Sequence, residues 1–349
     1  MEEAKTVVVD LVTWNSVGFL PAFFASMDAQ LYRDFTVTVV DNASDDGSLK
    51  WLAGERHDAA TLRNIKNLGF ARAHNQAIAM ALQRWPKEEW DRCYVLVANP
   101  DIELAPDCIR QLVAAMEADL ELAAAGPKLY RAILHRSEDG ERDVERTTTI
   151  DSTGLLMTKK RQAYDRGAGE EDKGQYDDKK EVFGLSGACV MFRASSLAQA
   201  AIGQEFFDED FFAYKEDVDL AWRMKRLGLR AQCVPHAVAW HHRGTPSNPK
   251  SSISKAFAKR LAKPAYVNTY STRNQFWLSV KNDELGNRLV QAPWVYPYAL
   301  GKLIVSIFSP SSLKGYGQAI AGWSKMRAKR RLIAPHVKIK GAEMRKWFV

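Results

Sequence analysis

Cysteine is scarce in this 349-residue sequence, which contains only four, at positions 93, 108, 189 and 233. No two of them form a CxxC pair, so neither a zinc ribbon nor a disulfide-stabilised secreted domain is expected. Long apolar stretches are missing too. The longest uncharged run, residues 11–27, has 17 residues and includes a proline and several polar residues, whereas a membrane-spanning helix needs about 20 apolar residues. The N-terminus, Met-Glu-Glu-Ala-Lys, has the wrong charge for a secretory signal, so we expect a reduced, cytoplasmic setting.

Two phosphate-binding signatures are also missing. There is no GxxxxGK[ST] loop, and no GxGxxG follows the first apolar run. Phosphate-loop NTPases and nicotinamide-dependent dehydrogenases bind phosphate groups through these glycine-rich turns, so both classes are excluded. What the chain does have is the composition of a globular protein, with 46% hydrophobic and 26% charged residues.

The formal net charge of +7 conceals an asymmetry along the chain. Residues 250–349 contain 19 Lys and Arg against 3 Asp and Glu, so residues 1–249 contain 30 basic and 39 acidic side chains. An acidic body is therefore followed by a strongly basic segment. Such an asymmetry indicates that the two parts have different partners.

Short β-branched runs alternate with helical patterns over the first 130 residues. We expect strands at 7–13, 36–41, 62–65 and 94–98, and helices at about 17–29, 45–54, 70–85 and 106–119. This alternation predicts an α/β fold with a mostly parallel sheet and helices on both of its faces. In such folds ligands bind beyond the carboxyl ends of the strands.

Residues 131–180 break the pattern, because 23 of these 50 residues are charged. We expect an exposed excursion here, with one hairpin around 147–158 and a mobile loop at 166–180. A core strand at 182–192, a helix in the second half of 207–228 and a last strand at 231–240 are expected to follow. Beyond Pro249 the sequence becomes helical, basic and aromatic. It thus predicts one domain over 1–249, with 131–180 as an insertion, and a helical extension over 250–349.

Four polar clusters stand where the predicted strands end. They are TWN at 13–15, DNASDDGS at 41–48, NLGFARAHN at 67–75 and NPD at 99–101. Each one alone is compatible with ordinary turn and cap chemistry, which uses Asp, Asn, Ser and Gly. All four at one edge of one sheet indicate a binding site. Acidic groups beside a bound diphosphate require a divalent cation between them.

These motifs carry a specific resemblance. From Val7 to Asn274 the sequence resembles the family 2 glycosyltransferases of the GT-A fold, close to the bacterial rhamnosyltransferase-like members. The matching motifs, in family order, are VTWN, DNASDDGS, NLGFARAHNQA, NPD, SGACVMFR, FDEDFFAYKEDVDLAWR and HHRG. The resemblance implies a GT-A catalytic domain over 1–249 that binds a nucleotide-diphosphate sugar.

For the donor pocket, the resemblance implies that Asp41 contacts the nucleotide base, since its carboxylate can accept the imide N–H of uracil or thymine. Thr13 and Asn15 would line the same pocket, and Asn67 and Gly69 would lie against the nucleoside and diphosphate. The remaining implied donor contacts are Asn42, Asn75, Asn99 and Arg273. A plain helix-entry turn is the alternative for Asn67 and Gly69.

Asn99-Pro100-Asp101 occupies the place of the family's DxD metal motif, with Asn99 replacing the first Asp. The resemblance therefore implies that Asp101 binds Mg²⁺ or Mn²⁺ and that Asn99 contacts the sugar. His241, through the family's H-x-x-G pattern, would be the second protein ligand. His242 is its neighbour on a strand and would point to the opposite face. The alternatives are a simple turn at 99–101 and a packed histidine.

The chemistry is expected at Glu216 and Asp217. Asp217 matches the family's base, which removes a proton from the acceptor hydroxyl, and Glu216 would orient the acceptor. A single base and direct displacement imply inversion at the anomeric carbon. Asp219 is expected to brace the helix. The alternative is that all three carboxylates form only the acidic first turn of a helix, favoured by its dipole.

The basic segment combines 19 Lys and Arg with many Trp, Tyr and Phe side chains, a pattern that suits interfacial helices, and its densest basic patch is at 325–331. No base-reading module is visible, so nucleic acid is not an expected partner. The pattern favours a membrane surface, at the inner face of the cell membrane, where a lipid-linked acceptor would be presented. A solvated helical appendage or a homodimer interface is the alternative.

The sequence as a whole predicts a metal-dependent, inverting glycosyltransferase. It would move rhamnose or a similar sugar from a dTDP- or UDP-sugar to a glycan or lipid-linked saccharide in cell-surface polysaccharide synthesis. A sugar-1-phosphate nucleotidyltransferase is an enzymatic alternative, but its GxGxR loop is missing. A non-catalytic protein that binds nucleotide sugars or polyanions is the other, because Asn99 departs from the metal motif.

Overall fold

The computed structural model describes residues 6–136, 142–242 and 263–349. The first five residues, Arg243 and Gly244 of the HHRG motif, and the expected domain boundary at 249/250 lie outside the described residues. The division into 1–249 and 250–349 therefore stays a prediction.

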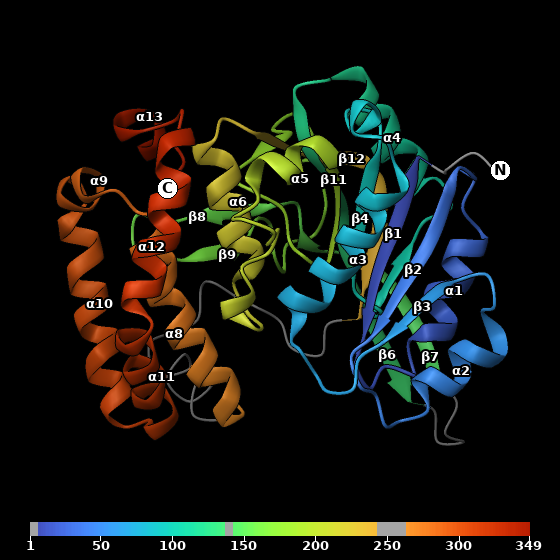
Figure 1. Ribbon diagram of the computed structural model, residues 1–349, viewed down its shortest axis with the longest axis horizontal. Helices are drawn as coiled ribbons and strands as arrows, with labels where there is room; N and C mark the ends of the chain where they lie inside the picture. Colours follow the sequence, from blue (N-terminus) through green and yellow to red (C-terminus); the bar gives the residue numbers. More distant parts are fainter. Residues whose placement is uncertain (1–5, 137–141, 243–262) are drawn as a thin grey trace.

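The first half of the chain forms the predicted parallel sheet. Its strands are β1 (Val7–Thr13), β2 (Phe35–Asp41), β3 (Ala60–Arg63) and β4 (Tyr94–Ala98), in the order β4-β1-β2-β3. The helices are α1 (Leu20–Asp28), α2 (Ser48–Glu55), α3 (Phe70–Arg84) and α4 (Cys108–Ala118). The β3 strand begins and ends two residues before the expected 62–65. The carboxyl ends of β2, β1 and β4 consequently lie side by side (Figure 1).

The second half adds strands in mixed directions. They are β5 (Ile102–Leu104), β6 (Leu122–Arg136), β7 (Arg142–Ser152), β8 (Leu155–Met157), β9 (Ala163–Asp165), β10 (Glu181–Val182), β11 (Cys189–Arg193) and β12 (Arg230–His241). The sheet runs β10-β12-β6-β11-β4-β1-β2-β3, with β5 on β12 and β7 on β6. Because β11 is antiparallel to both β4 and β6, the sheet is mixed: β6 and β12 are again parallel, whereas β5, β7 and β10 are antiparallel to their neighbours. The stretch expected as one strand at 182–192 is split between β10 and β11.

The expectation of an exposed excursion over 131–180 is wrong. Here β6 and β7 form a long antiparallel pair in the main sheet, and β8 and β9 form a second hairpin. The segment 166–180, expected to be mobile, is anchored by Lys128, whose ammonium lies 2.7 Å from both Asp172 and Asp177. The high density of charged residues did not predict exposure correctly, because oppositely charged side chains such as Lys128 and Asp172 form ion pairs between strands and loops.

Alternate residues of β1 face two different helical layers, as the period of a strand requires. Val7, Val9 and Leu11 pack with α1, α2 and α4, while Val8 packs with the layer of α3, α5 (Ala194–Ala200) and α6 (Glu216–Arg226). All four β1 side chains are buried. The sheet is thus covered on both faces, as the α/β prediction requires.

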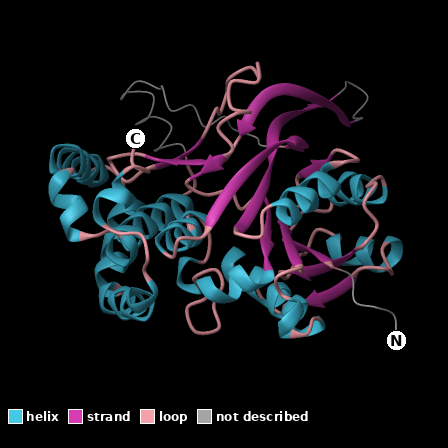
Figure 2. Cartoon of the chain, turned by 90° about the horizontal axis from the view of Figure 1, so that it is seen from above, coloured by secondary structure: helices cyan, strands magenta, loops and turns pink. Residues whose placement is uncertain are grey.

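Six further α-helices form a bundle at one end of the sheet, away from the N-terminus (Figures 1 and 2). They are α8 (Ala265–Asn282), α9 (Leu285–Val290), α10 (Ala292–Ile307), α11 (Pro310–Ala321), α12 (Trp323–Ile333) and α13 (Gly341–Arg345). The bundle packs against Trp222 of α6 through a shared core that includes Trp277, Met326 and Phe348. Across the described ranges, no helix is both long enough and apolar enough to cross a membrane.

Buried ion pairs connect this bundle to α6. Lys281 of α8 places its ammonium 2.5 Å from Asp208 and 2.7 Å from Asp219, and all three side chains are fully buried. Asp219 also accepts a hydrogen bond from Arg223, four residues on in α6. Lys329 of α12 lies 2.5 Å from Asp208. The structure therefore confirms the prediction that Asp219 braces α6.

We expect Lys281→Met to lower the free energy of unfolding by about 3–5 kcal/mol, because two buried carboxylates lose their shared cation. Denaturant unfolding followed by fluorescence measures this change. Lys325→Met is the matched control, since Lys325 also pairs with a carboxylate, Asp210, but is 62% exposed. The control should change stability by less than about 1 kcal/mol. Equal losses in both variants would contradict a special role for the buried pairs.

Candidate active site

The polar clusters of the sequence meet at one edge of the sheet. Thr13 and Asp41 are register partners at the ends of β1 and β2, and the Asn42 N–H donates to the Thr13 carbonyl at 2.8 Å. The β4 strand lies on the other side of β1 and runs directly into Asn99. Neighbouring strands are about 4.8 Å apart, so the ends of β2 and β4 are separated by about 10 Å. That span suits a nucleotide sugar lying across the strand ends.

Asp41 and Thr13 provide buried polar atoms without protein partners. The Asp41 Oδ2 accepts a hydrogen bond from the Ser44 N–H at 3.2 Å. Its Oδ1, and the Thr13 Oγ1, are buried and have no hydrogen-bond partner among the described residues. An unsatisfied buried polar atom costs about 1–3 kcal/mol, so such atoms are rare unless a ligand completes them. The pair fits the predicted base-binding role.

The turn at 67–69 is hydrogen-bonded to Asn42, which follows β2. The Asn42 amide donates to the Asn67 Oδ1 at 2.9 Å, and the Gly69 N–H donates to the same oxygen at 2.8 Å. Gly69 has a φ of 82°, and a Cβ there would lie 2.5 Å from the Phe212 carbonyl oxygen. The glycine is therefore required by the protein's own backbone, whereas the sequence suggested close approach of a ligand. Contact of these residues with the donor stays a prediction.

Three other predicted donor residues are held by protein groups. The Asn15 Oδ1 accepts from the Asp45 N–H at 2.9 Å, which ties together the loops after β1 and β2. Asn75 exchanges two hydrogen bonds of 2.8 Å with the backbone of Phe207. Arg273 donates to the carbonyls of Asp210 and Phe211 at 2.9 and 2.8 Å. Each of the three has a structural role here, and its donor contact stays a prediction.

Asp101 and His241, far apart in sequence, come together as predicted metal ligands must. The His241 Nε2 lies 3.4 Å from the Asp101 Oδ2. His242 points to the other face, with its Nε2 2.6 Å from Glu103, as expected for adjacent residues on a strand. Within the described ranges no group of three or more potential metal-ligating side chains occurs. A cation at Asp101 and His241 would therefore complete its coordination with substrate oxygens and water.

Asp151, at the end of β7, is a site residue that the sequence analysis missed. Its Oδ2 lies 2.9 Å from the His241 Nδ1, which leaves the Nε2 directed at Asp101. Burial alone would lower the pKa of His241, but the two carboxylates outweigh it and raise that pKa to about 9. Asp151 lies within residues 131–180, which were expected to form an exposed excursion. There was therefore no reason in the sequence to place it in the site.

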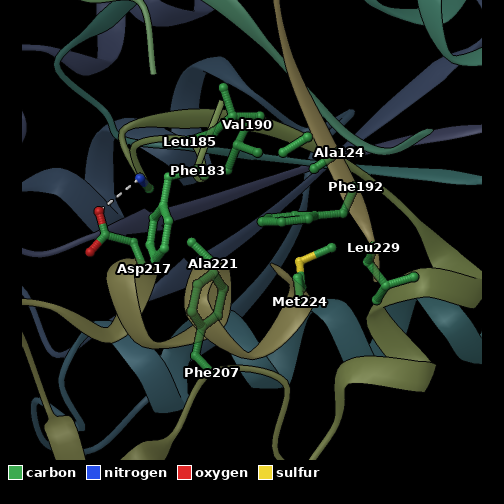
Figure 3. A pocket seen from close by; sticks show the side chains of 13 residues that line it. Ala124, Phe183, Leu185, Val190, Phe192, Phe207, Asp217, Ala221, Met224 and Leu229 are labelled. Carbon is green, nitrogen blue, oxygen red and sulfur yellow. Dashed lines mark hydrogen bonds between the residues drawn. The ribbon is translucent and has the colours of Figure 1, made fainter. Parts of the chain in front are cut away.

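Asp217 stands at the start of α6, and its Oδ2 accepts a hydrogen bond of 3.1 Å from the Gly187 N–H (Figure 3). Beyond Gly187, the Ala188 carbonyl accepts from the Asn99 N–H at 2.9 Å, so Asp217 adjoins the NPD motif through β11. The cavity drawn in Figure 3 is lined mainly by apolar side chains and measures only about 10 Å³. It holds one water molecule at most. A sugar therefore does not fit in this cavity.

Glu216 and Asp217 are adjacent carboxyl groups in different surroundings. Glu216 is buried, and its Oε2 has no hydrogen-bond partner in the described part of the chain. Burial, and then the neighbouring Asp217, raise the pKa of Glu216 to about 8. Glu216 therefore retains its proton at neutral pH.

Strained backbone surrounds this site. Among the described residues six non-glycine residues have positive φ, and five of them lie in the loops described above: Asn15, Ala43, Phe212, Tyr214 and Lys215. Such conformations cost about 1–3 kcal/mol each and persist only where the surroundings impose them. Asn274 of α8 imposes the last three. Its amide lies 3.0, 2.9 and 2.7 Å from the carbonyls of Phe211, Ala213 and Tyr214.

Sequence comparison identifies relatives of known activity. The chain is 28% identical over 253 residues to an N-acetylglucosaminyl-diphospho-decaprenol L-rhamnosyltransferase of Mycobacterium tuberculosis, covering 70% of this chain and 78% of the relative. It is 27% identical over 198 residues to the low-salt glycan biosynthesis hexosyltransferase Agl10 of Haloferax volcanii, covering 56% and 55% of the two chains.

Structural comparison supports the expected fold. A crystal structure of GalNAc-T7 with UDP, GalNAc and Mn²⁺ superposes with a TM-score of 0.53 at 12% identity, covering 89% of this chain and 59% of that one. The fold is therefore the GT-A fold of glycosyltransferases. Residues 9–199 match the description "Glycosyl transferase family 2". Because that match covers more than half of the sequence, the chain belongs to glycosyl transferase family 2 and is a glycosyltransferase.

Proposed function

We propose that this enzyme transfers rhamnose or a related hexose from a dTDP- or UDP-sugar to a glycan or lipid-linked saccharide, with inversion at the anomeric carbon. The proposal rests on one observation: Asp41 and Asp101 follow β2 and β4 at one edge of the sheet, and Asp217, at the start of α6, hydrogen-bonds to Gly187, whose neighbour Ala188 hydrogen-bonds to Asn99. The name of the mycobacterial relative supports a rhamnosyl donor and a saccharide acceptor on a lipid diphosphate. Synthesis of cell-surface polysaccharide, at the cytoplasmic face of the membrane, suits such an acceptor.

The donor's base is proposed to lie against Asp41. Its free Oδ1 accepts the imide N–H of uracil or thymine, and the Thr13 hydroxyl completes the pocket. Both bases present that N–H, whereas cytosine does not. The two buried oxygens therefore favour a uridine or thymidine nucleotide over a cytidine one.

The diphosphate is proposed to bind a divalent cation, Mg²⁺ or Mn²⁺, held by the Asp101 carboxylate and the His241 Nε2. An oxygen and a nitrogen donor that converge within 3.4 Å fit such an ion. When bound, the ion neutralises the charge that develops on the departing diphosphate. The Mn²⁺ in the GalNAc-T7 complex supports this assignment. Asp151 positions the imidazole through its Nδ1.

Asp217 is proposed to act as the base. It accepts the proton of the acceptor hydroxyl while that oxygen bonds to the anomeric carbon and the bond from this carbon to the diphosphate oxygen breaks. One displacement on the opposite face gives inversion. Because Glu216 keeps its proton, Asp217 is the carboxylate available for this role. Glu216 acts as a neutral neighbour that orients the acceptor.

Two alternatives from the sequence remain to be weighed. Membership of glycosyl transferase family 2 removes the sugar-1-phosphate nucleotidyltransferase. A non-catalytic binding protein would bind nucleotide sugars without turnover, so measurement of transfer separates it. We also propose that 1–249 is the catalytic domain and 250–349 an extension that completes it, because Asn274 supports the turn before Asp217.

Asp217→Asn should reduce the transfer rate by about 10²–10⁴-fold, because the base is lost while the shape of the side chain is kept. Nucleotide binding should be unchanged, which a thermal-shift panel of nucleotide sugars with and without Mn²⁺ measures. The exposed Asp178→Asn is the control and should transfer normally. Undiminished transfer by Asp217→Asn would remove Asp217 as the base.

Asp151→Asn should weaken Mn²⁺ binding by about 10–100-fold, since the partner that orients His241 is weakened. Isothermal titration of the protein with Mn²⁺ and UDP measures this affinity. Glu103→Gln is the matched control, because Glu103 contacts His242 in the same way on the other face of β12. If both variants lose affinity equally, the assignment of His241 over His242 is wrong.

Glu216→Gln should raise the melting temperature, and by more at pH 8.5 than at pH 5. The folded-state pKa of Glu216 is about 8 against an ordinary value of 4.5. The stability that its neutral form contributes is therefore complete below about pH 4.5 and is lost as the pH rises through 8. Glutamine stays neutral throughout. Differential scanning fluorimetry between pH 5 and 8.5 measures the difference in melting temperature between wild type and variant. The exposed Glu88→Gln is the control. A difference that does not change with pH would contradict the burial of a neutral carboxyl at Glu216.

A further inference from the structure

The C-terminal helices concentrate both positive charge and exposed apolar surface. Residues 285–342 contain ten Lys and Arg and no Asp or Glu. They also carry 14 of the 23 exposed large apolar side chains of the described residues. Scattered exposed apolar residues are ordinary, but a contiguous group marks an interaction surface.

The basic patch singled out in the sequence, 325–331, is not the centre of this surface. Lys329 is buried and lies within 2.8 Å of Glu205, Asp208 and Asp210. Lys325 pairs with Asp210 at 2.5 Å, and Arg330 donates to the carbonyls of Val280 and Asp283. These side chains hold α12 to the body of the protein. Residues after 325 also include buried core residues, so truncation there would disturb folding.

Helix α10, at the outer edge of the bundle in Figure 1, has its polarity reversed relative to an ordinary surface helix. Its inner side includes Tyr298, Lys302 and Ser306, and Ser306 is its only buried residue. Its outer side is apolar throughout. Leu300, Leu303, Ile304, Ile307 and the adjoining Phe308 each expose 45–66% of their surface.

The inner side of α10 is not tightly packed either. It faces a cavity of about 820 Å³ between α8, α10 and α11, whose lining includes the cationic side chains of Lys160, Arg288 and Lys302. At the first turn, the Lys159 ammonium lies 5.4 Å from the Trp294 ring. The cations near α10 thus lie at its first turn and along the cavity on its inner side.

We propose that the outer side of α10 docks on an anionic lipid bilayer, with its apolar side chains at the depth of the headgroups and the neighbouring Lys and Arg on the lipid phosphates. This deepens the proposed function, since it names the surface on which a lipid-linked acceptor would be met. The 16 residues of α10 span about 24 Å, less than the hydrocarbon thickness of about 30 Å, so the helix lies along the interface. Trp294 and Tyr296 suit that depth.

Charge favours the bilayer over a second copy of this chain. Self-association through α10 would bring together two copies of the cations beside this helix, Lys159 and Lys160, with no Asp or Glu in residues 285–342 to offset them. An anionic membrane surface attracts the same side chains. The occupant with complementary charge is therefore the bilayer.

The experiment is co-sedimentation of the full chain with vesicles of phosphatidylglycerol and phosphatidylcholine, or of phosphatidylcholine alone. The triple variant Leu300→Glu, Ile304→Glu, Ile307→Glu should bind anionic vesicles at least about tenfold more weakly than wild type. A matched triple variant at exposed apolar residues elsewhere, Leu31→Glu, Leu120→Glu, Ile133→Glu, should bind like wild type. Added salt should weaken binding.

Transfer to a water-soluble acceptor saccharide should persist in the α10 variant, which also shows that it is folded. Loss of vesicle binding with retained transfer supports the docking surface independently of the catalytic assignment. Equal vesicle binding by wild type and the α10 variant would overturn the proposal, and so would equal binding to neutral and anionic vesicles. A wild-type dimer that the α10 variant converts to monomer, with vesicle binding unchanged, would assign the face to a second copy instead.

Discussion

The buried ion pairs around Lys281 are the constraint on which the rest of this structure depends. A single ammonium is shared by Asp208 and Asp219, and Lys329 adds a second cation to Asp208. Burial alone would raise the pKa of Asp208, but the two cations hold it well below its usual range. Charges this deeply buried are tolerated only in pairs, so α6, α8 and α12 have one relative position. The carboxylates come from the acidic body and the cations from the basic segment, so part of the charge asymmetry of the sequence is neutralised internally.

The site depends on the C-terminal helices for a second reason. The three contacts of Asn274, with the carbonyls of Phe211, Ala213 and Tyr214, support the loop in which Phe212, Tyr214 and Lys215 have positive φ. That loop fills the space above Gly69 and sets where α6 begins. The position of Asp217 is therefore determined jointly by the strand ends of the first half of the chain and by helices more than 50 residues downstream.

The same bundle also has an apolar helix face that the rest of the described chain leaves exposed. Lys329 and Arg330 are committed to the interior, whereas α10 presents isoleucine and leucine to the outside. One segment thus supports the turn before Asp217 and also exposes an apolar helix face, for which we propose a lipid bilayer as the partner.

Local pattern was sufficient for much of this protein. Apolar runs followed by Asp, Asn and Gly determined the parallel strands and the edge at which Thr13, Asp41 and Asp101 meet, because strand period and the topology of parallel sheets leave little freedom. Only the tertiary structure decided that Asp151 orients His241, that Glu216 keeps its proton and that Gly69 makes room for Phe212. Those outcomes depend on burial and on partners distant in sequence, and no local pattern encodes either. The charges of 131–180 and 325–331 resembled a solvated surface for the same reason, since what neutralises them comes from elsewhere in the fold.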